Sequence, residues 1–411
     1  MFFYISFLRP PPYQVPPGVP VAITPQVAND LRTELFTEAQ DIYYSWLPAS
    51  PAGGAPQHPI HIPRPVKLTT WREANAYREV PVPPPQAARD GQTYRLVLTA
   101  HSQGVPYIAN LAADATGERP LPVLSMPIAF SSRRGAGPAK QERVERVYRV
   151  CSDTGEQAFL SVKEQTSFDL DKKVWDSGIG LSSWVTGLFQ GTVDTSASPL
   201  VSELRVALTA QDCQVLELGA GTGIVSLALG ALRSSRQGAE PSGCIITTDL
   251  ASAMPLLEEN IAANKALFRN AAATPEAAVL DWDEQELPSR VAAIGSGFDV
   301  ILMADVTYNT ASFPALVRTL AAVLAIGDPQ PPRPPPLVLL GYKERDAAER
   351  TLWELAAGVG VAFERVGERR GAGGSPVEVW LARARGGGAK RRGEAQASPA
   401  PGARRGAGDS D

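Results

Sequence analysis

The chain has 411 residues, of which 44% are hydrophobic, so it can build a sizeable core in one decorated domain or in two domains. Its formal net charge of −4 excludes a globally basic nucleic-acid-binding protein. The three cysteines form no C-x-x-C pair, which argues against a disulfide framework and indicates a reducing compartment. No apolar run approaches the roughly 20 residues that a membrane-spanning helix needs, and we expect no membrane contact.

The first part of the chain, residues 1–140, is rich in proline, which interrupts any periodic pattern. Between the prolines the sequence predicts a helix over Leu31–Trp46 and a strand over Thr93–Ala100. The Ser, Arg and Gly residues of 131–138 are typical of a flexible connector. We therefore expect a Pro-rich N-terminal region of irregular and uncertain fold.

The second part, residues 141–385, has a sharper pattern. The turn residues Ser152–Gly155 lie between two apolar runs, 147–151 and 159–162, and predict an N-terminal β-hairpin. Strands and helices alternate after the hairpin. The candidate strands are 214–218, 244–249, 278–282, 298–304, 337–342, 361–366 and 377–382. The candidate helices are 223–233, 252–267, 312–325 and 345–357.

This alternation predicts an α/β domain with a mostly parallel, doubly wound sheet. The last two candidate strands are joined by Gly367–Ser375, which leaves no room for a helix, so we expect them to pair antiparallel. Residues 386–411 contain Gly, Ala, Pro, Ser and charged residues and cannot bury enough apolar surface to fold. They are predicted to be a disordered basic tail. Within it, Lys390–Arg392 favours a solvated segment, with a nuclear-import or nucleic-acid patch as the alternatives.

A glycine-rich turn follows the first strand of this domain. Gly219, Gly221 and Gly223 occupy alternate positions between an apolar strand and an apolar helix. Such a turn could belong to a dehydrogenase or a methyltransferase, or serve packing alone, but the spacing departs from the G-x-G-x-x-G of dinucleotide sites. Asp249 ends the next strand, where its carboxylate could accept hydrogen bonds from a ribose; the alternative is a helix N-cap.

The segment Glu217–Gly223 resembles motif I of the seven-strand S-adenosylmethionine-dependent methyltransferases. Four further segments resemble methyltransferase family 16, in the same order along the chain. They are Trp175–Ser182 (W-D-x-x-x-x-L-S), Leu257–Asn264 (L-x-x-N-x-x-x-N), Leu280–Trp282 (L-D-W) and Asp305–Tyr308 (D-x-x-Y). This family includes protein lysine methyltransferases, among them the methyltransferase-like 21 group. The resemblance implies a Rossmann-like seven-strand sheet with the last strand antiparallel and S-adenosyl-L-methionine as cofactor.

The resemblance also implies which residues hold this cofactor. They are Trp175, Gly219, Ala220, Gly221, Gly223, Asp249, Asp281, Trp282 and Ala304. Trp282 would stack on the adenine, with Asp281 near its amine, and Trp175 would lie near the methionine end. Alternatively, Trp282 is part of the core and Trp175 anchors the hairpin to the domain. Asn260 and Asn264 share one helix face, and we expect a structural role for them.

Asp305 and Tyr308 are the candidate catalytic residues. Asp305 falls at the carboxyl end of a buried strand, where ligands bind in open α/β sheets. Its carboxylate could hold a substrate amine, and the ring of Tyr308 could wall the slot and face the cation. The alternative for Asp305 is a loop cap with Asn309 finishing the turn.

The leading hypothesis is a protein-lysine N-methyltransferase that acts on a protein substrate. The alternatives are a methyltransferase for a small molecule or a nucleic acid, and a non-catalytic binding protein of the same fold. We expect a monomer in the cytoplasm, with the nucleus as a second location, and no stable nucleic-acid partner. His58 and His61 have no Cys or acidic partner at useful spacing, so no metal site is predicted.

Overall fold

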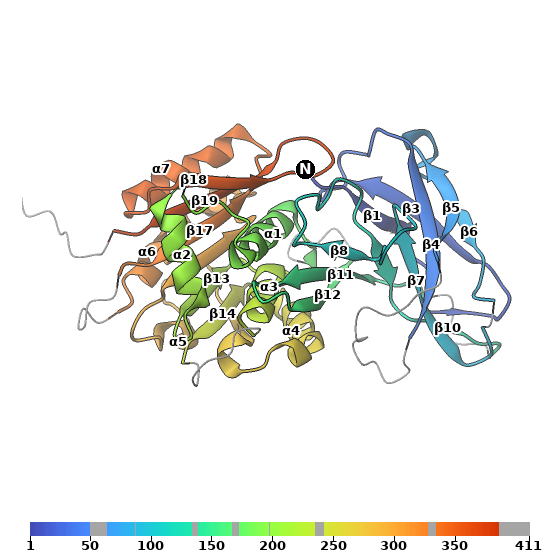
Figure 1. The fold of residues 1–411 in the computed structure, drawn as a ribbon, viewed down its shortest axis with the longest axis horizontal. Coiled ribbons are helices and arrows are strands. Elements are labelled where there is room, and N and C mark those ends of the chain that lie inside the picture. Colours follow the sequence, from blue (N-terminus) through green and yellow to red (C-terminus); the bar gives the residue numbers. More distant parts are fainter. Residues whose placement is uncertain are drawn as a thin grey trace, which may run out of the picture.

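The computed structural model describes residues 1–49, 64–86, 88–133, 139–166, 172–196, 198–234, 242–327 and 334–385. The predicted tail, most of the predicted connector, and His58 and His61 lie outside these residues. Figure 1 shows a β-rich N-terminal unit beside an α/β domain. We call residues 1–166 the N-terminal unit and residues 172–385 the sheet domain.

The N-terminal unit consists of two sheets. A three-stranded sheet has the order β1-β3-β6, and a nine-stranded sheet contains the other strands of the unit. The strands are β1 (Tyr4–Arg9), β2 (Gln14–Val15), β3 (Val21–Ala28), β4 (Gln40–Pro48), β5 (Val66–Trp71), β6 (Val80–Val82), β7 (Gln92–Thr99), β8 (Ile108–Asn110), β9 (Val123–Ser125), β10 (Ile128–Phe130), β11 (Arg143–Cys151) and β12 (Gln157–Gln165).

This unit is more regular than its proline content indicates. The strand expected at Thr93–Ala100 is β7, but the helix expected over Leu31–Trp46 is wrong, because no helix forms there and the last part of that segment belongs to β4. Strand β4 pairs antiparallel with both β5 and β7, which lie far from it in sequence. Pairing partners of this kind override local propensity, and short strands between prolines leave little periodicity to detect.

The predicted hairpin forms, as strands β11 and β12. We expected it to open the sheet domain. In the structure β11 pairs with β8 and β9, so the hairpin is an integral part of the nine-stranded sheet. Its other contacts are with the sheet domain, because Leu160 and Val162 share a hydrophobic core with helices α1 (Asp176–Gln190) and α3 (Ile224–Ser234). The hairpin therefore joins the two parts of the molecule.

The sheet domain contains seven strands in the order β15-β14-β13-β16-β17-β19-β18. Their bounds are β13 (Gln214–Leu218), β14 (Cys244–Asp249), β15 (Pro275–Val279), β16 (Val300–Ala304), β17 (Leu337–Tyr342), β18 (Glu364–Arg369) and β19 (Val377–Arg383). The strands from β15 to β17 are parallel, and β19 pairs antiparallel with β17 and β18. This confirms the predicted doubly wound, seven-strand Rossmann-like sheet with its last strand antiparallel.

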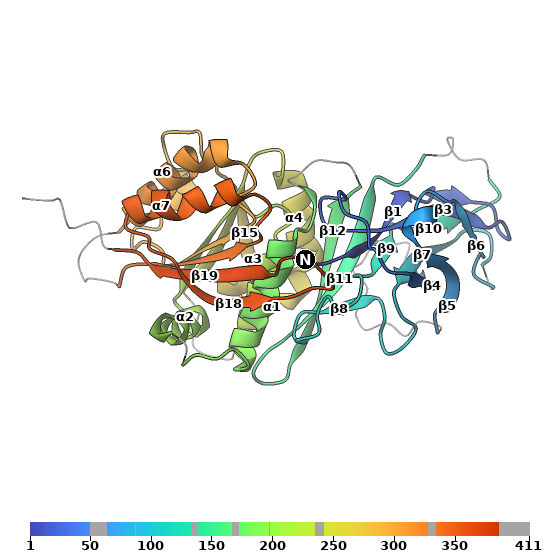
Figure 2. The ribbon, with the colours of Figure 1, turned by 90° about the horizontal axis from the view of Figure 1, so that it is seen from above.

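Helices cover both faces of this sheet, as Figure 2 shows for α6 and α7 on one side and α1 and α2 on the other. The remaining helices are α2 (Pro199–Thr209), α4 (Met254–Ala263), α5 (Ser289–Ala292), α6 (Phe313–Leu324) and α7 (Thr351–Gly358). Successive strand residues alternate between the faces, so Val215 lies in one core and Leu216 in the other. The sequence did not predict helices α1 and α2. Helix α1 is buried on almost every side, so it has no polar face that would mark a helical period.

Candidate active site

A cavity of about 230 Å³ opens at the carboxyl ends of β13, β14 and β16. This is the edge of a parallel sheet at which ligands of open α/β folds bind. Of the eleven site residues that the sequence predicts, only Gly223 is outside the lining. The ten that line it are Trp175, Gly219, Ala220, Gly221, Asp249, Asp281, Trp282, Ala304, Asp305 and Tyr308. The cavity thus collects residues that are up to 133 positions apart in the sequence.

The glycine turn forms the floor of the cavity. Gly219, Gly221 and Gly223 have φ angles of 69°, 55° and 82°, a region that side chains with a Cβ atom rarely adopt. Gly223 serves helix packing, because a Cβ atom there would lie 2.5 Å from the side chain of Leu257. A Cβ atom on Gly219 would lie 2.9 Å from Val306 and 3.3 Å from the ring of Trp282. Only a turn without side chains leaves this space open.

Asp249 is fixed against the same turn. Its Oδ2 accepts a hydrogen bond of 2.6 Å from the backbone N–H of Gly221, and its Oδ1 accepts one from Leu250. Helix α4 begins after Ala253 and has no side-chain cap, so Asp249 is not its N-cap. The carboxylate therefore lies beside the glycine turn, in the lining of the cavity.

Trp282 and Asp281 occupy the loop after β15. Trp282 is half-buried against the core of α6, and its carbonyl oxygen accepts a hydrogen bond from the Nη2 of Arg318. The ring edge lies next to Gly219 in the lining of the cavity. Asp281 is exposed and accepts a hydrogen bond from the backbone of Asp283. The half-buried ring makes Trp282 both a core residue and a wall of the cavity.

Glu217 is a residue of the lining that the sequence-based site did not include. It is buried at the end of β13, and its Oε2 accepts hydrogen bonds from the hydroxyls of Ser226 and Thr247. Burial, reinforced by the charge of Asp249, raises the pKa of Glu217 from its ordinary value of 4.5 to about 7. The motif contained the available signal, because Glu217 stands two positions before Gly219, the first glycine of the turn.

Asn260 and Asn264 are structural, as expected. Their side-chain amides pair with the backbone of strand β12 as a neighbouring strand would. Asn260 accepts from Lys163 N–H and donates to the carbonyls of Lys163 and Thr222. Asn264 accepts from Ser161 N–H and donates to its carbonyl. Helix α4 is thereby fixed to the hairpin and to the glycine turn.

Asp305 and Tyr308 line the same cavity. Tyr308 is 56% exposed, whereas Asp305 is buried. Asp305 has a φ angle of 61°, which an aspartate tolerates better than most residues. Asn309 caps the following short 3-10 helix by itself, without help from Asp305. The loop-cap alternative for Asp305 is therefore not what the structure shows.

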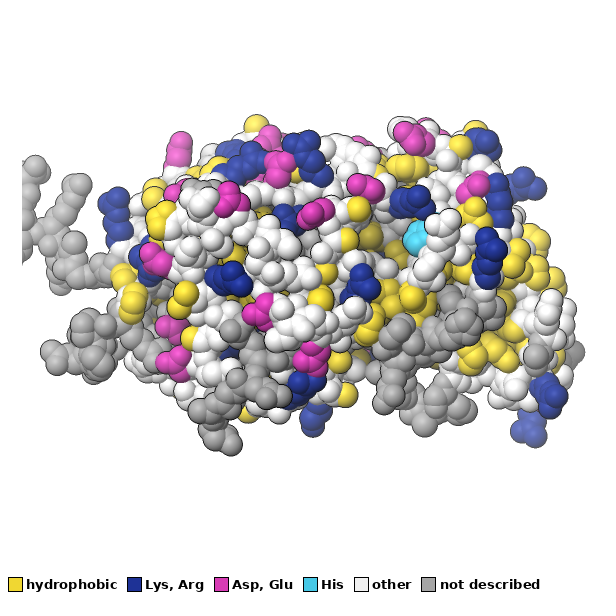
Figure 3. Space-filling model, viewed as in Figure 1, with side chains coloured by type: hydrophobic (Ala, Val, Ile, Leu, Met, Phe, Trp, Pro, Cys, Tyr) yellow, Lys and Arg dark blue, Asp and Glu magenta, His cyan; other side chains and the backbone are white. Residues whose placement is uncertain are grey.

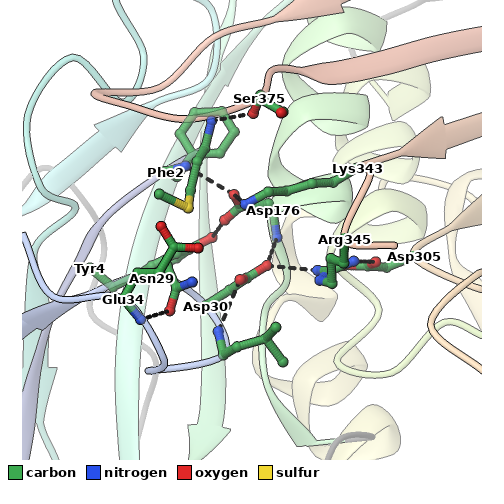
Figure 4. Close-up of polar contacts among 12 residues, drawn as sticks. Phe2, Tyr4, Asn29, Asp30, Glu34, Asp176, Asp305, Lys343, Arg345 and Ser375 are labelled. Carbon is green, nitrogen blue, oxygen red and sulfur yellow. Dashed lines mark hydrogen bonds and ion pairs between the residues drawn. The ribbon is translucent and has the colours of Figure 1, made fainter. Parts of the chain in front are cut away.

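A charged network surrounds Asp305, and sequence reasoning missed it (Figure 4). Arg345 donates through both terminal nitrogens to the two carboxylate oxygens of Asp305. The same guanidinium donates to Asp30 of the N-terminal unit at 2.8 Å. Asp30 also accepts from the backbone N–H of Asp176, whose carboxylate accepts from Lys343 at 2.9 Å. Arg345 could have been suspected from its place after strand β17, whereas nothing in the local sequence marks Asp30.

Among the described residues, no group of three or more His, Cys, Asp or Glu side chains could hold a metal ion. Within the same residues, no helix is long and apolar enough to cross a membrane. A second cavity, of about 730 Å³, lies in the N-terminal unit and shares no residue with the first. Its lining includes His101 and Arg149 but none of the predicted site residues.

Residues 154–357 match the model of a lysine methyltransferase family. The chain is 30% identical over 183 residues to the protein-lysine N-methyltransferase EFM6 of Saccharomyces cerevisiae, which covers 43% of this chain and 68% of the yeast protein. It is also 30% identical over 109 residues to the EEF1A lysine methyltransferase 3 of Xenopus tropicalis, over 26% of this chain and 40% of that protein.

Solved structures with a similar fold include the fibrillarin of Aeropyrum pernix with bound S-adenosyl-L-methionine. That similarity has a TM-score of 0.33 and 13% identity, and covers 72% of this chain and 96% of the fibrillarin. The magnesium protoporphyrin IX methyltransferase of Synechocystis has a TM-score of 0.30 and 15% identity, over 50% and 84% of the two chains.

The sheet order, the glycine turn and the family match together define the class. The chain belongs to the lysine methyltransferase family. It is a protein-lysine N-methyltransferase whose methyl donor is S-adenosyl-L-methionine.

Proposed function

We propose that methyl transfer takes place in the cavity at the carboxyl edge of the sheet. The residues present there fit an adenosyl group on two observations. The turn at Gly219 leaves a space that a Cβ atom would fill, and the carboxylate of Asp249 lies beside that turn. In this proposal Asp249 binds the ribose and Trp282 the adenine. The other cofactor residues are Trp175, Gly219, Ala220, Gly221, Asp281 and Ala304, with Gly223 supporting the turn from below.

The bound cofactor supplies an electrophilic methyl group, which the lone pair of the lysine amine takes as the carbon–sulfur bond breaks toward sulfur. The lysine must therefore arrive without its proton, although its solution pKa of about 10.4 keeps it charged at neutral pH. Asp305 attracts the amine into the slot and orients it by a hydrogen bond, while the proton leaves to solvent. Tyr308 forms the outer wall, where its exposed ring can face the arriving cation. Holding the two reacting groups in line lowers the activation barrier and so contributes strongly to the rate enhancement.

The bidentate pair with Arg345 supports this role for Asp305 over that of a general base. Burial raises the pKa of the Asp305 carboxyl, and the two charged hydrogen bonds from Arg345 oppose that rise by favouring the ionised form. In that form Asp305 has remaining lone pairs for a substrate ammonium or amine. This observation carries the proposal, because it leaves positioning as the chemistry that Asp305 can perform.

The experiment that tests this proposal is labelling of cell-extract proteins with tritiated-methyl S-adenosylmethionine, followed by mass spectrometry of the labelled band. We expect the wild type to label a lysine and Asp305→Ala to bind the cofactor in calorimetry but to label at least about 100-fold more slowly. Thr310→Ala is a matched control, because it changes the same exposed loop without touching the network. Unchanged labelling by Asp305→Ala would remove Asp305 from the acceptor site.

The identity of the protein substrate is a separate proposal. EEF1A, the acceptor in the name of the Xenopus relative, is the first defined protein to test. On the face drawn in Figure 3, the described basic and acidic side chains are interspersed, so charge alone marks no docking patch there. We further propose that the enzyme acts as a monomer in the cytoplasm, with the nucleus as a second location, and forms no stable complex with nucleic acid.

A further inference from the structure

Arg345, whose side chain pairs with the carboxylate of Asp305, lies outside the cavity. Asp305 and Trp175 line the cavity, whereas Arg345 does not, so Arg345 approaches the carboxylate from the side away from the substrate slot. Asp305 follows β16 and Arg345 follows β17, and these two parallel strands are neighbours in the sheet. Their carboxyl ends therefore bring the two side chains together at the same edge.

The geometry leaves room for both Arg345 and a substrate amine on one carboxylate. A carboxylate offers about four lone-pair sites, and Arg345 uses two of them. The guanidinium also lies over the ring of Trp175, with 5.6 Å between Cζ and the ring centroid. Arg345 is thus held by an ion pair on one side and an aromatic face on another, and only 14% of its side chain is exposed.

Asp30 fixes Arg345 from the N-terminal unit. The side chain of Asp30 is 1% exposed, and its Oδ2 accepts from both Arg345 and the backbone of Asp176. Its Oδ1 accepts from the backbone of Leu31. Figure 4 shows Arg345 between Asp30 and Asp305, so a line of polar contacts runs from the N-terminal unit to the substrate slot.

We propose that Arg345 is a positioning residue for methyl transfer, and that Asp30 holds it, so that the N-terminal unit takes part in building the acceptor site. This inference rests on the proposed function, in which Asp305 receives the lysine amine. Arg345 keeps the Asp305 carboxylate turned toward the slot in its left-handed backbone conformation. Without this partner, a carboxyl group buried at this depth takes up a proton and no longer attracts an ammonium group.

The test measures initial rates of extract labelling with tritiated-methyl S-adenosylmethionine between pH 7 and pH 9, in the full-length protein. Arg345→Met removes the positive charge and keeps the aliphatic length of the side chain. Arg345→Lys keeps a positive charge at this position. Asp30→Asn removes the negative charge that pairs with Arg345. Arg350→Met is the matched control, because Arg350 stacks on Tyr342 and pairs with Glu344 without reaching Asp305. Calorimetry with S-adenosylhomocysteine checks that each variant is folded and binds the cofactor product.

We expect Arg345→Met to label about 100-fold more slowly at pH 7 and to bind S-adenosylhomocysteine as the wild type does. The ratio of wild-type to variant rate should shrink toward pH 9, as Asp305 loses its proton. Arg345→Lys should recover part of the rate, since a lysine restores charge without the bidentate geometry. Asp30→Asn should cause a smaller loss in the same direction.

A second readout needs neither cofactor nor substrate. The charged groups that act on Asp305 are Arg345, Asp30 and Lys343. In the unliganded Arg345→Met variant, a carboxyl buried without its partner has a raised pKa, so its contribution to stability is lost as pH rises from 5 to 8. The thermal midpoint should fall over this range by more than that of the wild type, and adding Asp305→Asn should remove this excess fall.

Two results would overturn the inference. One is a folded Arg345→Met that labels extract at the wild-type rate. The other is an equal loss at every pH, with no dependence of the thermal midpoint on Asp305, which would make Arg345 a structural ion pair only. If Arg345→Met does not fold, Arg345→Lys and Asp30→Asn carry the test, and wild-type rates in both overturn it. Unchanged labelling by Asp305→Ala is the distinct failure of the proposed function.

Discussion

At the scale of single residues, the cavity combines groups whose properties depend on burial. The glycines of the turn have no side chain to fill the space beside them. Glu217 and Asp305 are buried carboxyl groups with defined hydrogen-bond partners. The sequence identified ten of the residues that line the cavity, because each belongs to a local motif. It did not identify Arg345 and Asp30, because their roles arise from contacts between segments 315 positions apart.

Gly221→Arg should abolish cofactor binding without unfolding the protein. Gly221 lines the cavity with a φ angle of 55°, so an arginine there places its side chain in the ligand space and strains the turn. We expect calorimetry to show no heat with S-adenosylmethionine, while circular dichroism stays native. Gly295→Arg, at a position where a Cβ atom meets nothing within 4 Å, is the control and should bind normally.

Glu217 gives the unliganded protein a pH-dependent stability. Its pKa of about 7 when folded lies above its ordinary value of 4.5, so the native state binds the extra proton. The resulting stabilisation is complete below about pH 4.5 and is lost as pH rises through about 7, with a total on the order of 3 kcal/mol. Thermal unfolding of wild type and Glu217→Gln should therefore differ increasingly, in favour of Gln, from pH 5 to pH 8. A constant difference would contradict the raised pKa.

At the scale of elements, helix α4 shows how a sequence motif can serve the fold. The amides of Asn260 and Asn264 replace a missing strand next to β12. The spacing i, i+4 on a helix matches two alternate residues of a strand, Ser161 and Lys163. The same spacing was visible in the sequence, but its partner strand was not, since the hairpin lies about 100 residues away.

Asn260→Ala should destabilise the protein by roughly 2–4 kcal/mol, because it leaves buried backbone groups of Lys163 and Thr222 without partners. Chemical denaturation at fixed pH measures this loss. Glu258→Ala, at an exposed position of the same helix, should change stability by less than about 0.5 kcal/mol. Equal stability of the two variants would show that the asparagine contacts contribute nothing.

At the scale of the whole molecule, the two parts share one core and one polar network. Phe2 and Tyr4 pack in the same hydrophobic cluster as helices α1 and α3. Their backbone and hydroxyl groups donate to the buried carboxylate of Asp176, which also pairs with Lys343. The N-terminal unit is thus joined to the sheet domain at the end where the cavity opens.

Asp176→Ala should lower the free energy of unfolding by about 3–5 kcal/mol, because it leaves the buried Lys343 ammonium and two further donors unpaired. Differential scanning calorimetry should show a clearly lower midpoint. Asp212→Ala, at an exposed position of the sheet domain, is the control and should unfold with the wild type. A wild-type midpoint for Asp176→Ala would mean that this junction does not stabilise the molecule.

The sequence by itself determined the sheet domain and the glycine turn with Asp249 in the lining of its cavity. Strands β13 and β14 are apolar runs that end in turn residues, and the glycines and Asp249 follow them directly, so local pattern carries this information. Only the tertiary structure decided the fold of the N-terminal unit, the place of the hairpin, and the partners of Asp305. These features depend on pairing between distant strands and on charges that become neighbours only after folding, which leave no periodic trace in the chain.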